Sequence, residues 1–409
     1  MKILLLTPLY KLPGESILNN TNVCGSFAKE WVKLGHEVRV IYQYPIYNKI
    51  FHIAADLFAK QIANKFYGTV TTNRFTKIDK YLDEGVEVIR IPLYKFAPHF
   101  LYPTQSINYQ INEIIRINKE DNFVPDIITG HFYYPNIEIV GKLKHTYQNS
   151  RTCIVIHYQG ININKTKKYL DKTCPQLINS IDVWGYRSHP IREYFEKVYG
   201  HKENFFYCYS GIPTSFLESP QIKHYNPLNS FIYIGALIKR KYPLAVLKSL
   251  ERLKIDFTLG YIGEGNQRQK IEQYAKKKNI SKSVKLYGHI ERTSIIKLLD
   301  KAQVFIMISR KETFGLVYIE AMARHCIVIA SRNEGMEGII KHGVNGFLCN
   351  AGDDKELSQI LNYIYSLTAD NKQKIANNAY ETAQGMTDRI VANSYLQNIT
   401  EVDNVKHER

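Results

Sequence analysis

The stretch Ser309-Arg-Lys-Glu-Thr-Phe-Gly-Leu-Val-Tyr-Ile-Glu-Ala-Met-Ala323 predicts a loop followed by a helix. The residues just before it, Val304–Ile308, form a short apolar run that is typical of a buried strand. Glu312 would then lie on the loop and Glu320 inside the helix, with seven residues between the two carboxylates. The backbone N–H groups between them belong to residues that include Phe314, Gly315 and Leu316.

This arrangement favours a ligand with a phosphate in the middle and hydroxyls on both sides. The start of a helix next to a glycine binds phosphate through its backbone N–H groups. An ionised carboxylate only accepts hydrogen bonds, so Glu312 and Glu320 are suited to hold hydroxyl groups. The pattern therefore predicts a nucleotide-sugar site around Gly315.

The same run resembles the signature of the family 4 retaining glycosyltransferases (glycosyl transferases group 1), which carry a Glu, seven residues and a second Glu here. Further motifs of the family occur in the expected order along the C-terminal half. They are Tyr233-Ile-Gly-Ala-Leu-Ile-Lys-Arg-Lys241, Tyr261-Ile-Gly-Glu-Gly-Asn266, Cys326-Ile-Val-Ile-Ala-Ser331, Glu334-Gly-Met-Glu-Gly338 and Gly343-Val-Asn-Gly-Phe347. The N-terminal half resembles the family only in its alternation of strands and helices.

That alternation predicts an α/β protein with parallel strands joined by helical crossovers. Expected strands are Ile3–Thr7, Glu37–Ile41, Val86–Pro92, Asp126–Gly130, Cys153–His157, Ile181–Trp184, Asn204–Ile212, Ser230–Gly235, Asp256–Ile262, Ser283–Tyr287, Val304–Ile308 and Cys326–Ala330. Expected helices are Val23–Leu34, Gln105–Lys119, Ile137–Tyr147, Pro190–Tyr199, Pro243–Leu253, Gln267–Lys277, Ser294–Asp300, Phe314–Arg324 and Asn393–Val402, and Asp353-Asp354 is expected to cap another.

The resemblance implies the GT-B fold, in which two Rossmann-like, doubly wound domains face a cleft. The first, on the acceptor side, would span 1–213 and be completed by 389–409, because the C-terminal helix crosses back to it. The second, binding the nucleotide sugar, would span 214–388. A chain of 409 residues is long enough for two such cores.

Roles for individual residues also follow from the resemblance. Glu312 would contact hydroxyls of the donor sugar, Glu320 would hold the ribose, and Lys241 would neutralise the diphosphate leaving group. The family has Arg directly after the glycine at Gly235, where this chain has Ala236, and Arg240 is the candidate to replace it. The expected donor-binding residues are Gly235, Arg240, Lys241, Gly263, Gly265, Glu312, Phe314, Gly315, Leu316 and Glu320.

Residues of the N-terminal half are expected on the acceptor side. His157 ends a predicted strand where the family often has a histidine facing the reacting groups, so it joins Glu312 and Lys241 as a candidate catalytic residue. His131 ends the preceding predicted strand. Gly14 and Asn20 lie in the loop after the first strand, where the family binds its acceptor.

The composition narrows the cellular setting. Six scattered cysteines argue for the cytoplasm, and no apolar run reaches the roughly 20 residues that span a bilayer. The formal net charge of +16 suits an anionic partner or a lysine-rich surface. Basic clusters interleaved with aromatic residues are absent, which argues against nucleic acid. One stretch, 49–66, has a helical apolar stripe flanked by lysines and could rest on the inner face of an anionic plasma membrane or pack on the sheet.

The sequence thus predicts a retaining, metal-independent glycosyltransferase that moves a sugar from a nucleoside diphosphate to a glycan or lipid-linked acceptor. Uridine is the family's commonest base, and bacterial cell-surface polysaccharide synthesis is the expected setting. No cofactor and no divalent metal are expected, because the chain contains no D-x-D motif. Two alternatives stay open: a sugar-nucleotide epimerase of the same fold, and a non-enzymatic basic protein that binds membrane surfaces.

Overall fold

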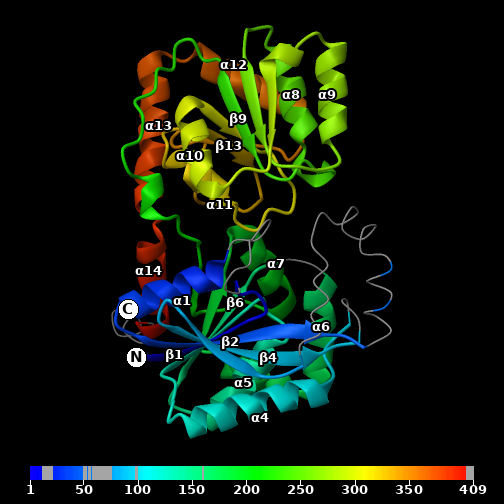
Figure 1. The fold of residues 1–409 in the computed structure, drawn as a ribbon, viewed down its shortest axis with the longest axis vertical. Helices are drawn as coiled ribbons and strands as arrows, with labels where there is room; N and C mark the ends of the chain where they lie inside the picture. The colour runs from blue at the N-terminus through cyan, green and yellow to red at the C-terminus, as the bar shows by residue number, and fades with distance from the viewer. Residues whose placement is uncertain are drawn as a thin grey trace. The chain divides into compact units, whose positions relative to one another are not determined.

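The structure is a computed structural model that describes residues 1–11, 22–48, 53, 57, 76–96, 100–158 and 161–401. The chain divides into two compact units (Figure 1). The first contains Met1–Arg187, Ile191–Cys208 and the chain from Ala392 onward, and the second contains Ser188–Pro190 and Tyr209–Val391. The C-terminal segment thus returns to the first unit, as a GT-B fold requires.

The described part of the first unit contains one eight-stranded sheet in the order β3-β4-β2-β1-β5-β6-β7-β8. All neighbouring strands are parallel except β3, which runs antiparallel to β4 at the edge. Without β3, the order is that of a doubly wound sheet, whose strand order reverses between β1 and β5. The strands are β1 (Lys2–Thr7), β2 (Glu37–Ile46), β3 (Asp79–Asp83), β4 (Val86–Tyr94), β5 (Ile127–His131), β6 (Arg151–Ile156), β7 (Val183–Tyr186) and β8 (Phe205–Tyr207).

Helices cover both faces of this sheet, with α1 on one face and α4 and α5 on the other (Figure 1). The helices are α1 (Val23–Lys33), α4 (Thr104–Glu120), α5 (Asn136–Thr146), α6 (Ile161–Thr173), α7 (His189–Tyr199) and the last helix, α14 (Asp388–Thr400). The buried indole of Trp31 on α1 donates a hydrogen bond to the Ala392 carbonyl of α14 at 2.9 Å. This contact fixes the returning helix against the first unit.

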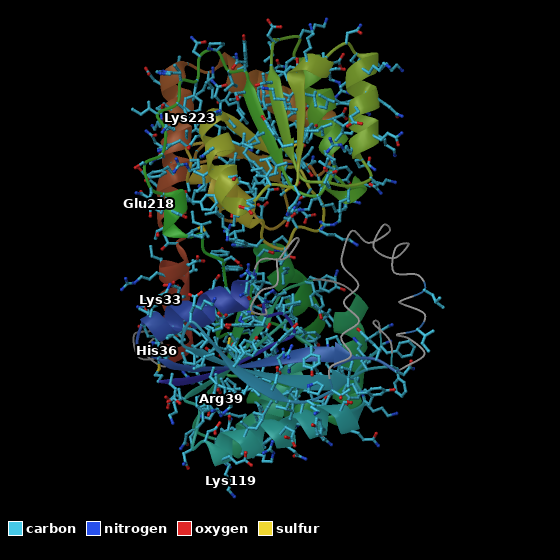
Figure 2. All side chains as sticks on the ribbon, viewed as in Figure 1. Lys33, His36, Arg39, Lys119, Glu218 and Lys223 are labelled. Carbon is cyan, nitrogen blue, oxygen red and sulfur yellow. The ribbon has the colours of Figure 1, made fainter. Side chains whose placement is uncertain are left out.

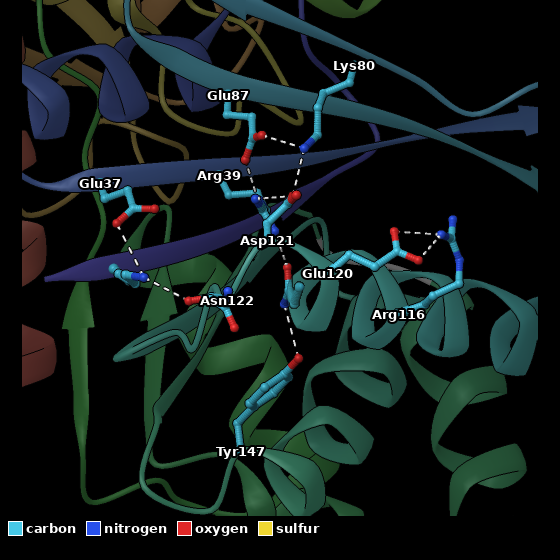
Figure 3. Close-up of polar contacts among 11 residues, drawn as sticks. Glu37, Arg39, Lys80, Glu87, Arg116, Glu120, Asp121, Asn122 and Tyr147 are labelled. Carbon is cyan, nitrogen blue, oxygen red and sulfur yellow. Dashed lines mark hydrogen bonds and ion pairs between the residues drawn. The ribbon is translucent and has the colours of Figure 1, made fainter.

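A network of paired charges holds the amino-terminal end of this sheet together (Figure 3). Arg39 on β2 is 3% exposed, and its guanidinium pairs with Glu87 on β4 and with Asp121 after α4, the latter at 2.7 Å. Lys80 on β3 pairs with the same two carboxylates at 2.8 and 2.7 Å. Because a buried charge is costly unless it is paired, the network specifies where β3 and α4 attach and is not a candidate ligand site.

The second unit repeats the doubly wound plan with a described six-stranded parallel sheet in the order β11-β10-β9-β12-β13-β14. Its strand order reverses between β9 and β12. The strands are β9 (Ser230–Ile234), β10 (Thr258–Ile262), β11 (Val284–Gly288), β12 (Val304–Ile306), β13 (Ile327–Ser331) and β14 (Phe347–Cys349), and the helices are α8 (Pro243–Arg252), α9 (Arg268–Lys277), α10 (Arg292–Lys301), α11 (Leu316–Met322), α12 (Asp354–Ser366) and α13 (Ala369–Gln384). The fold class predicted from the sequence is confirmed.

Several elements differ from the prediction. Strand β3 was not predicted, because DKYLD has neither a continuous apolar run nor a regular alternation of polar and apolar residues. Strand β14, which is only three residues long, was not predicted. Helices α6 and α13 were not predicted either. Helix α11 begins at Leu316, two residues later than predicted, because Gly315 before it adopts the left-handed conformation with φ 88°. Asp353 caps α12 as expected, accepting hydrogen bonds from the N–H groups of Lys355 and Glu356 at 3.0 Å.

Charged side chains project from the outer surfaces of both units (Figure 2). Lys33 at the end of α1 and Lys119 near the end of α4 are exposed examples. Lys223, in contrast, is buried, and its ammonium donates to the Leu299 carbonyl at 2.7 Å at the end of α10. Within the parts of the chain that the structure describes, no helix is both long and apolar enough to cross a bilayer.

Candidate functional site

The predicted donor site lies at the point where the strand order of the second sheet reverses. Lys241 follows β9, and Glu312 follows β12, the two strands on either side of this reversal. Ligands of open doubly wound sheets bind beyond the carboxyl ends of the strands at this position. The topology therefore places both predicted residues where a ligand is expected.

Lys241 and Glu312 form an ion pair, with 3.2 Å between Lys241 Nζ and Glu312 Oε2. Both side chains are about one-sixth exposed, at 15% and 16%. The Ser309 hydroxyl also donates to Glu312 Oε2, at 3.1 Å, and the backbone N–H of Glu312 donates to a Glu334 carboxylate oxygen at 2.8 Å. Glu312 is thus held in one orientation by a cation, a hydroxyl and its own backbone.

Glu334 was not predicted as a site residue, although it begins the motif Glu334-Gly-Met-Glu-Gly338. Burial raises the pKa of its carboxyl, and the hydrogen bonds from the N–H groups of Lys311 and Glu312 oppose that rise. The structure assigns it the task of holding the Glu312 loop. No local sequence pattern indicates this role, because it arises from a tertiary contact with the Glu312 loop.

Glu320 lies in α11 and is 5% exposed, more buried than a free helix-surface charge. Arg292, the first residue of α10, donates through Nε to Glu320 Oε1 at 2.7 Å. Burial raises the pKa of Glu320, and the Arg292 guanidinium opposes the rise. Sequence reasoning missed Arg292, since nothing near it in the chain resembles a motif.

Glycines allow two loops of the site to touch. A Cβ at Gly263 would collide with the Gly235 carbonyl oxygen, and one at Gly265 would collide with the Leu237 carbonyl oxygen. The close approach is stabilised by a hydrogen bond from the Leu237 N–H to the Glu264 carbonyl at 2.9 Å. The G-x-G motif therefore has a packing role, and its predicted contact with the donor stays a prediction.

The loop before α11 packs against another glycine, Gly335. A Cβ at Gly335 would lie 2.6 Å from the backbone N and Cα of Phe314. The Phe314 side chain is buried and stacks on Tyr209, with 5.6 Å between ring centroids. Phe314 therefore packs through its backbone against Gly335 and through its ring against Tyr209, which suits the predicted binding of phosphate by the neighbouring N–H groups.

Arg240 lies next to the Glu312 loop without joining the ion pair. Its guanidinium donates to the Arg310 carbonyl at 3.3 Å, and its own carbonyl accepts from the Arg310 N–H at 2.8 Å. The exposed Arg240 side chain belongs to the same segment after β9 as Lys241. Its predicted role at the diphosphate is therefore compatible with its position.

In the first unit, the two predicted histidines contact each other. His131 Nδ1 lies 2.9 Å from His157 Nε2, and His131 Nε2 lies 3.0 Å from the hydroxyl of Tyr395 on α14. Burial, with a smaller contribution from the Arg187 guanidinium, lowers the pKa of His131 to about 3. Burial likewise lowers the pKa of His157 well below its usual value, with additional contributions from His131 and Arg187. Both imidazoles are therefore neutral near pH 7.

Tyr395 was missed by sequence reasoning, because it follows no motif and contacts His131 only through the return of α14. Gly14, Asn20 and the predicted 49–66 helix, apart from residues 53 and 57, lie outside the described residues.

Comparison with solved structures confirms a GT-B type protein. The structure of HepE from Anabaena in complex with UDP superposes with a TM-score of 0.67, covering 98% of this chain and all of that one at 16% identity. The glycosyltransferase of Rickettsia africae gives a TM-score of 0.68 at 16% identity, covering 98% of each chain.

The sequence comparisons match mainly the second unit. Residues 216–382 match the family model of the glycosyl transferases group 1. The chain is 32% identical over 124 residues to the N-acetyl-alpha-D-glucosaminyl L-malate synthase of Bacillus anthracis, a match that covers 30% of this chain and 32% of that one. The matches to the first curated relatives span about a third of their length, 36% and 32%. TuaC of Bacillus subtilis, named as a teichuronic acid biosynthesis glycosyltransferase, is 23% identical over 404 residues, 95% of each chain.

Proposed function

We propose that the chain is a retaining, metal-independent glycosyltransferase that transfers a sugar from a nucleoside diphosphate to a hydroxyl of a glycan or lipid-linked acceptor. The group 1 domain and the fold support a transferase that uses an activated sugar. The observation that carries the proposal is the Lys241–Glu312 ion pair at the strand-order reversal of the second sheet. A cation and a carboxylate 3.2 Å apart offer one group for a diphosphate and one for the hydroxyls of the attached sugar.

The nucleoside is proposed to lie towards Glu320. A carboxylate that already accepts from Arg292 retains lone pairs for ribose hydroxyls. Uridine is the proposed base, since HepE, which shares the fold, has been solved with UDP and with UDP-glucose.

The proposed chemistry is a front-face displacement. The acceptor hydroxyl attacks the anomeric carbon from the side of the leaving group, the bond between that carbon and the diphosphate oxygen breaks, and the departing phosphate takes the hydroxyl proton. Negative charge grows on the diphosphate, so Lys241 and the N–H groups beside Gly315 stabilise the transition state more than the ground state. Glu312 orients the sugar, and His157 is proposed as a further catalytic residue.

Bacterial cell-surface polysaccharide synthesis is the proposed setting. TuaC is named for teichuronic acid biosynthesis, and LpsE of Rhizobium meliloti, 27% identical over 167 residues, is named for lipopolysaccharide core biosynthesis. An acceptor of this type is often lipid-linked, so we propose a cytoplasmic protein peripheral to the plasma membrane, and the net charge of +16 supports attraction to anionic lipid.

The test is a panel of nucleoside-diphosphate sugars, each incubated with the protein and with glycan or lipid-linked acceptors in the presence of EDTA. We expect release of one nucleoside diphosphate, dependence on an acceptor, and a product that keeps the anomeric configuration of the donor. Isomerisation of a sugar nucleotide without an acceptor would instead support the epimerase. Loss of all turnover in EDTA, restored by Mg²⁺, would contradict metal independence.

A further inference from the structure

A chain of four buried polar groups links α14 to His157. The Thr129 hydroxyl lies 2.6 Å from the Tyr395 hydroxyl, which lies 3.0 Å from His131 Nε2, and His131 Nδ1 lies 2.9 Å from His157 Nε2. Thr129 and His131 are fully buried, and Tyr395 and His157 are 2% and 7% exposed. Both nitrogens of His131 and one nitrogen of His157 are therefore engaged away from solvent.

The surrounding residues fix the positions of the two rings. The His131 carbonyl accepts from the Asn136 side chain at 2.6 Å, and β5 is followed by two residues with positive φ, Phe132 at 68° and Tyr133 at 54°. Such a backbone persists only where its surroundings determine it strongly. The ring of Phe132 stacks on His157, with 3.9 Å between centroids. Little freedom is left to either imidazole except the position of its proton.

Each neutral imidazole carries one N–H. The direction of the hydrogen bond between Tyr395 and His131 therefore decides which nitrogen carries the proton in both rings. A phenolic O–H is a better donor than its oxygen is an acceptor, so Tyr395 donates to His131 Nε2 while Thr129 donates to Tyr395. His131 then carries its proton on Nδ1 and donates it to His157 Nε2. His157 must in turn carry its proton on Nδ1.

We propose that Tyr395 is a positioning residue that acts through His131 to hold His157 in the Nδ1–H form, so that His157 presents a hydrogen-bond donor to a hydroxyl oxygen of the substrate. The opposite order of protons would turn the same nitrogen into an acceptor. The inference about catalysis rests on the proposed sugar transfer, but the position of the proton does not. A tyrosine on the returning helix thereby sets the chemistry of a residue at the carboxyl end of β6.

The proton is located directly by ¹⁵N NMR of the full chain labelled at histidine, with the two signals assigned by their loss in His131→Asn and His157→Asn. We expect Nδ1 of both rings to be protonated at pH 7.5 in the wild type. Protonation of His157 at Nε2 would overturn the proposal without any further variant. In Tyr395→Phe, which keeps the aromatic packing on Phe27 and Trp31, the His131 proton should move to Nε2 and that of His157 should follow.

Tyr44→Phe is the matched control, because Tyr44 is also buried in the first unit and its hydroxyl donates to the Lys77 carbonyl at 3.1 Å. We expect Tyr395→Phe to lower kcat for sugar transfer about five- to tenfold, with KM for the donor changed less than twofold, and Tyr44→Phe to leave both unchanged. An altered tautomer with unaltered kcat would overturn the positioning role. Absence of transfer from every donor in the wild type would refute the proposed function, while the NMR result would still decide the proton positions.

Discussion

The ammonium of Lys241 lies 3.2 Å from the carboxylate of Glu312, so each group neutralises the other when no ligand is bound. A diphosphate that approaches Lys241 must therefore compete with Glu312 for it. In the proposed complex, Glu312 turns to the hydroxyls of the sugar and Lys241 to the phosphate. Lys241 and Glu312 would then neutralise each other before the ligand binds. After binding, Lys241 would contact the diphosphate and Glu312 the sugar.

Replacing Glu312 by Gln should separate binding from turnover. We expect Glu312→Gln to bind UDP up to about fivefold more tightly, because Lys241 is freed and an anion next to the phosphate is removed. Sugar transfer should fall at least about a hundredfold, because Glu312 no longer orients the sugar. Isothermal titration calorimetry and a product assay measure the two effects.

Asp83→Asn is the control for this change. Asp83 pairs with Lys29 at 3.1 Å, and the two side chains are 19% and 21% exposed, close to the values for Glu312 and Lys241. It should affect neither UDP binding nor transfer. Weaker UDP binding in Glu312→Gln with unchanged turnover would contradict the assigned roles.

A second prediction concerns Glu320 and the ribose. Wild-type protein should bind UDP about ten- to a hundredfold more tightly than its 2′,3′-dideoxy analogue, because a charged acceptor loses its hydroxyl partners. In Glu320→Gln, this discrimination should shrink to less than about threefold. Arg292 would lose its anionic partner, but its side chain is 43% exposed and can be solvated.

Calorimetry with both nucleotides measures the discrimination, and Glu272→Gln supplies the control. Glu272 accepts from Arg268 at 3.2 Å on the exposed surface of α9. Equal discrimination in Glu320→Gln and in wild type would place the ribose elsewhere.

Lys241 and Glu312 could be selected from the sequence as candidate donor-site residues because both occur within short motifs. Lys241 and Glu312 each follow a recognisable apolar strand, and parallel strands that neighbour each other bring their carboxyl ends together. Arg292, Glu334 and Tyr395 were missed because their roles arise only from tertiary contacts. Tyr395, for example, is 264 positions away from His131 in the chain and reaches it through a helix whose own pattern gives no reason to connect them.

The elements of the fold also divide into those that a local sequence pattern predicts and those that depend on tertiary contacts. Strands β1, β6 and β9 were predicted because continuous apolar runs indicate buried parallel strands. Strand β3 was missed because its place at the sheet edge depends on charges, including those that link Lys80 to Glu87 and Asp121. Pairings of that kind connect residues that are distant in the chain and have no local periodicity.

A third prediction concerns acid stability. The native pKa values of His131 and His157 lie below that of an unfolded histidine, near 6.5. Between pH 6.5 and those native values, the unfolded chain binds more protons than the native one, so stability falls as pH falls. Each histidine contributes a loss of at most about 1.4 kcal/mol per pH unit in this window and none above it.

Urea unfolding at pH 7.5, 6.0 and 5.0 measures this dependence. The loss of stability with acid should be smaller in His131→Asn, which removes one of the two buried imidazoles. His201→Asn, at a position where the side chain is 64% exposed, should retain the wild-type dependence. An unchanged slope in His131→Asn would show that the buried pair does not control acid stability.

The last prediction tests whether the backbone of the Glu312 loop is held by Gly335. In Gly335→Ala, the new methyl group would lie 2.6 Å from the backbone N and Cα of Phe314, and backbone atoms cannot move aside as a flexible side chain can. We expect a loss of about 1 to 3 kcal/mol in unfolding free energy, the usual range for overpacking. Because the displaced segment carries Glu312 at one end and Gly315 at the other, UDP binding should weaken as well. Gly385→Ala is the matched control, since its nearest neighbour would be the Thr382 carbonyl oxygen at an ordinary 3.6 Å and its φ of −73° suits alanine. A Gly335→Ala protein with wild-type stability and UDP affinity would show that the loop tolerates displacement. The prediction that phosphate binds to rigidly held N–H groups beside Gly315 would then be wrong.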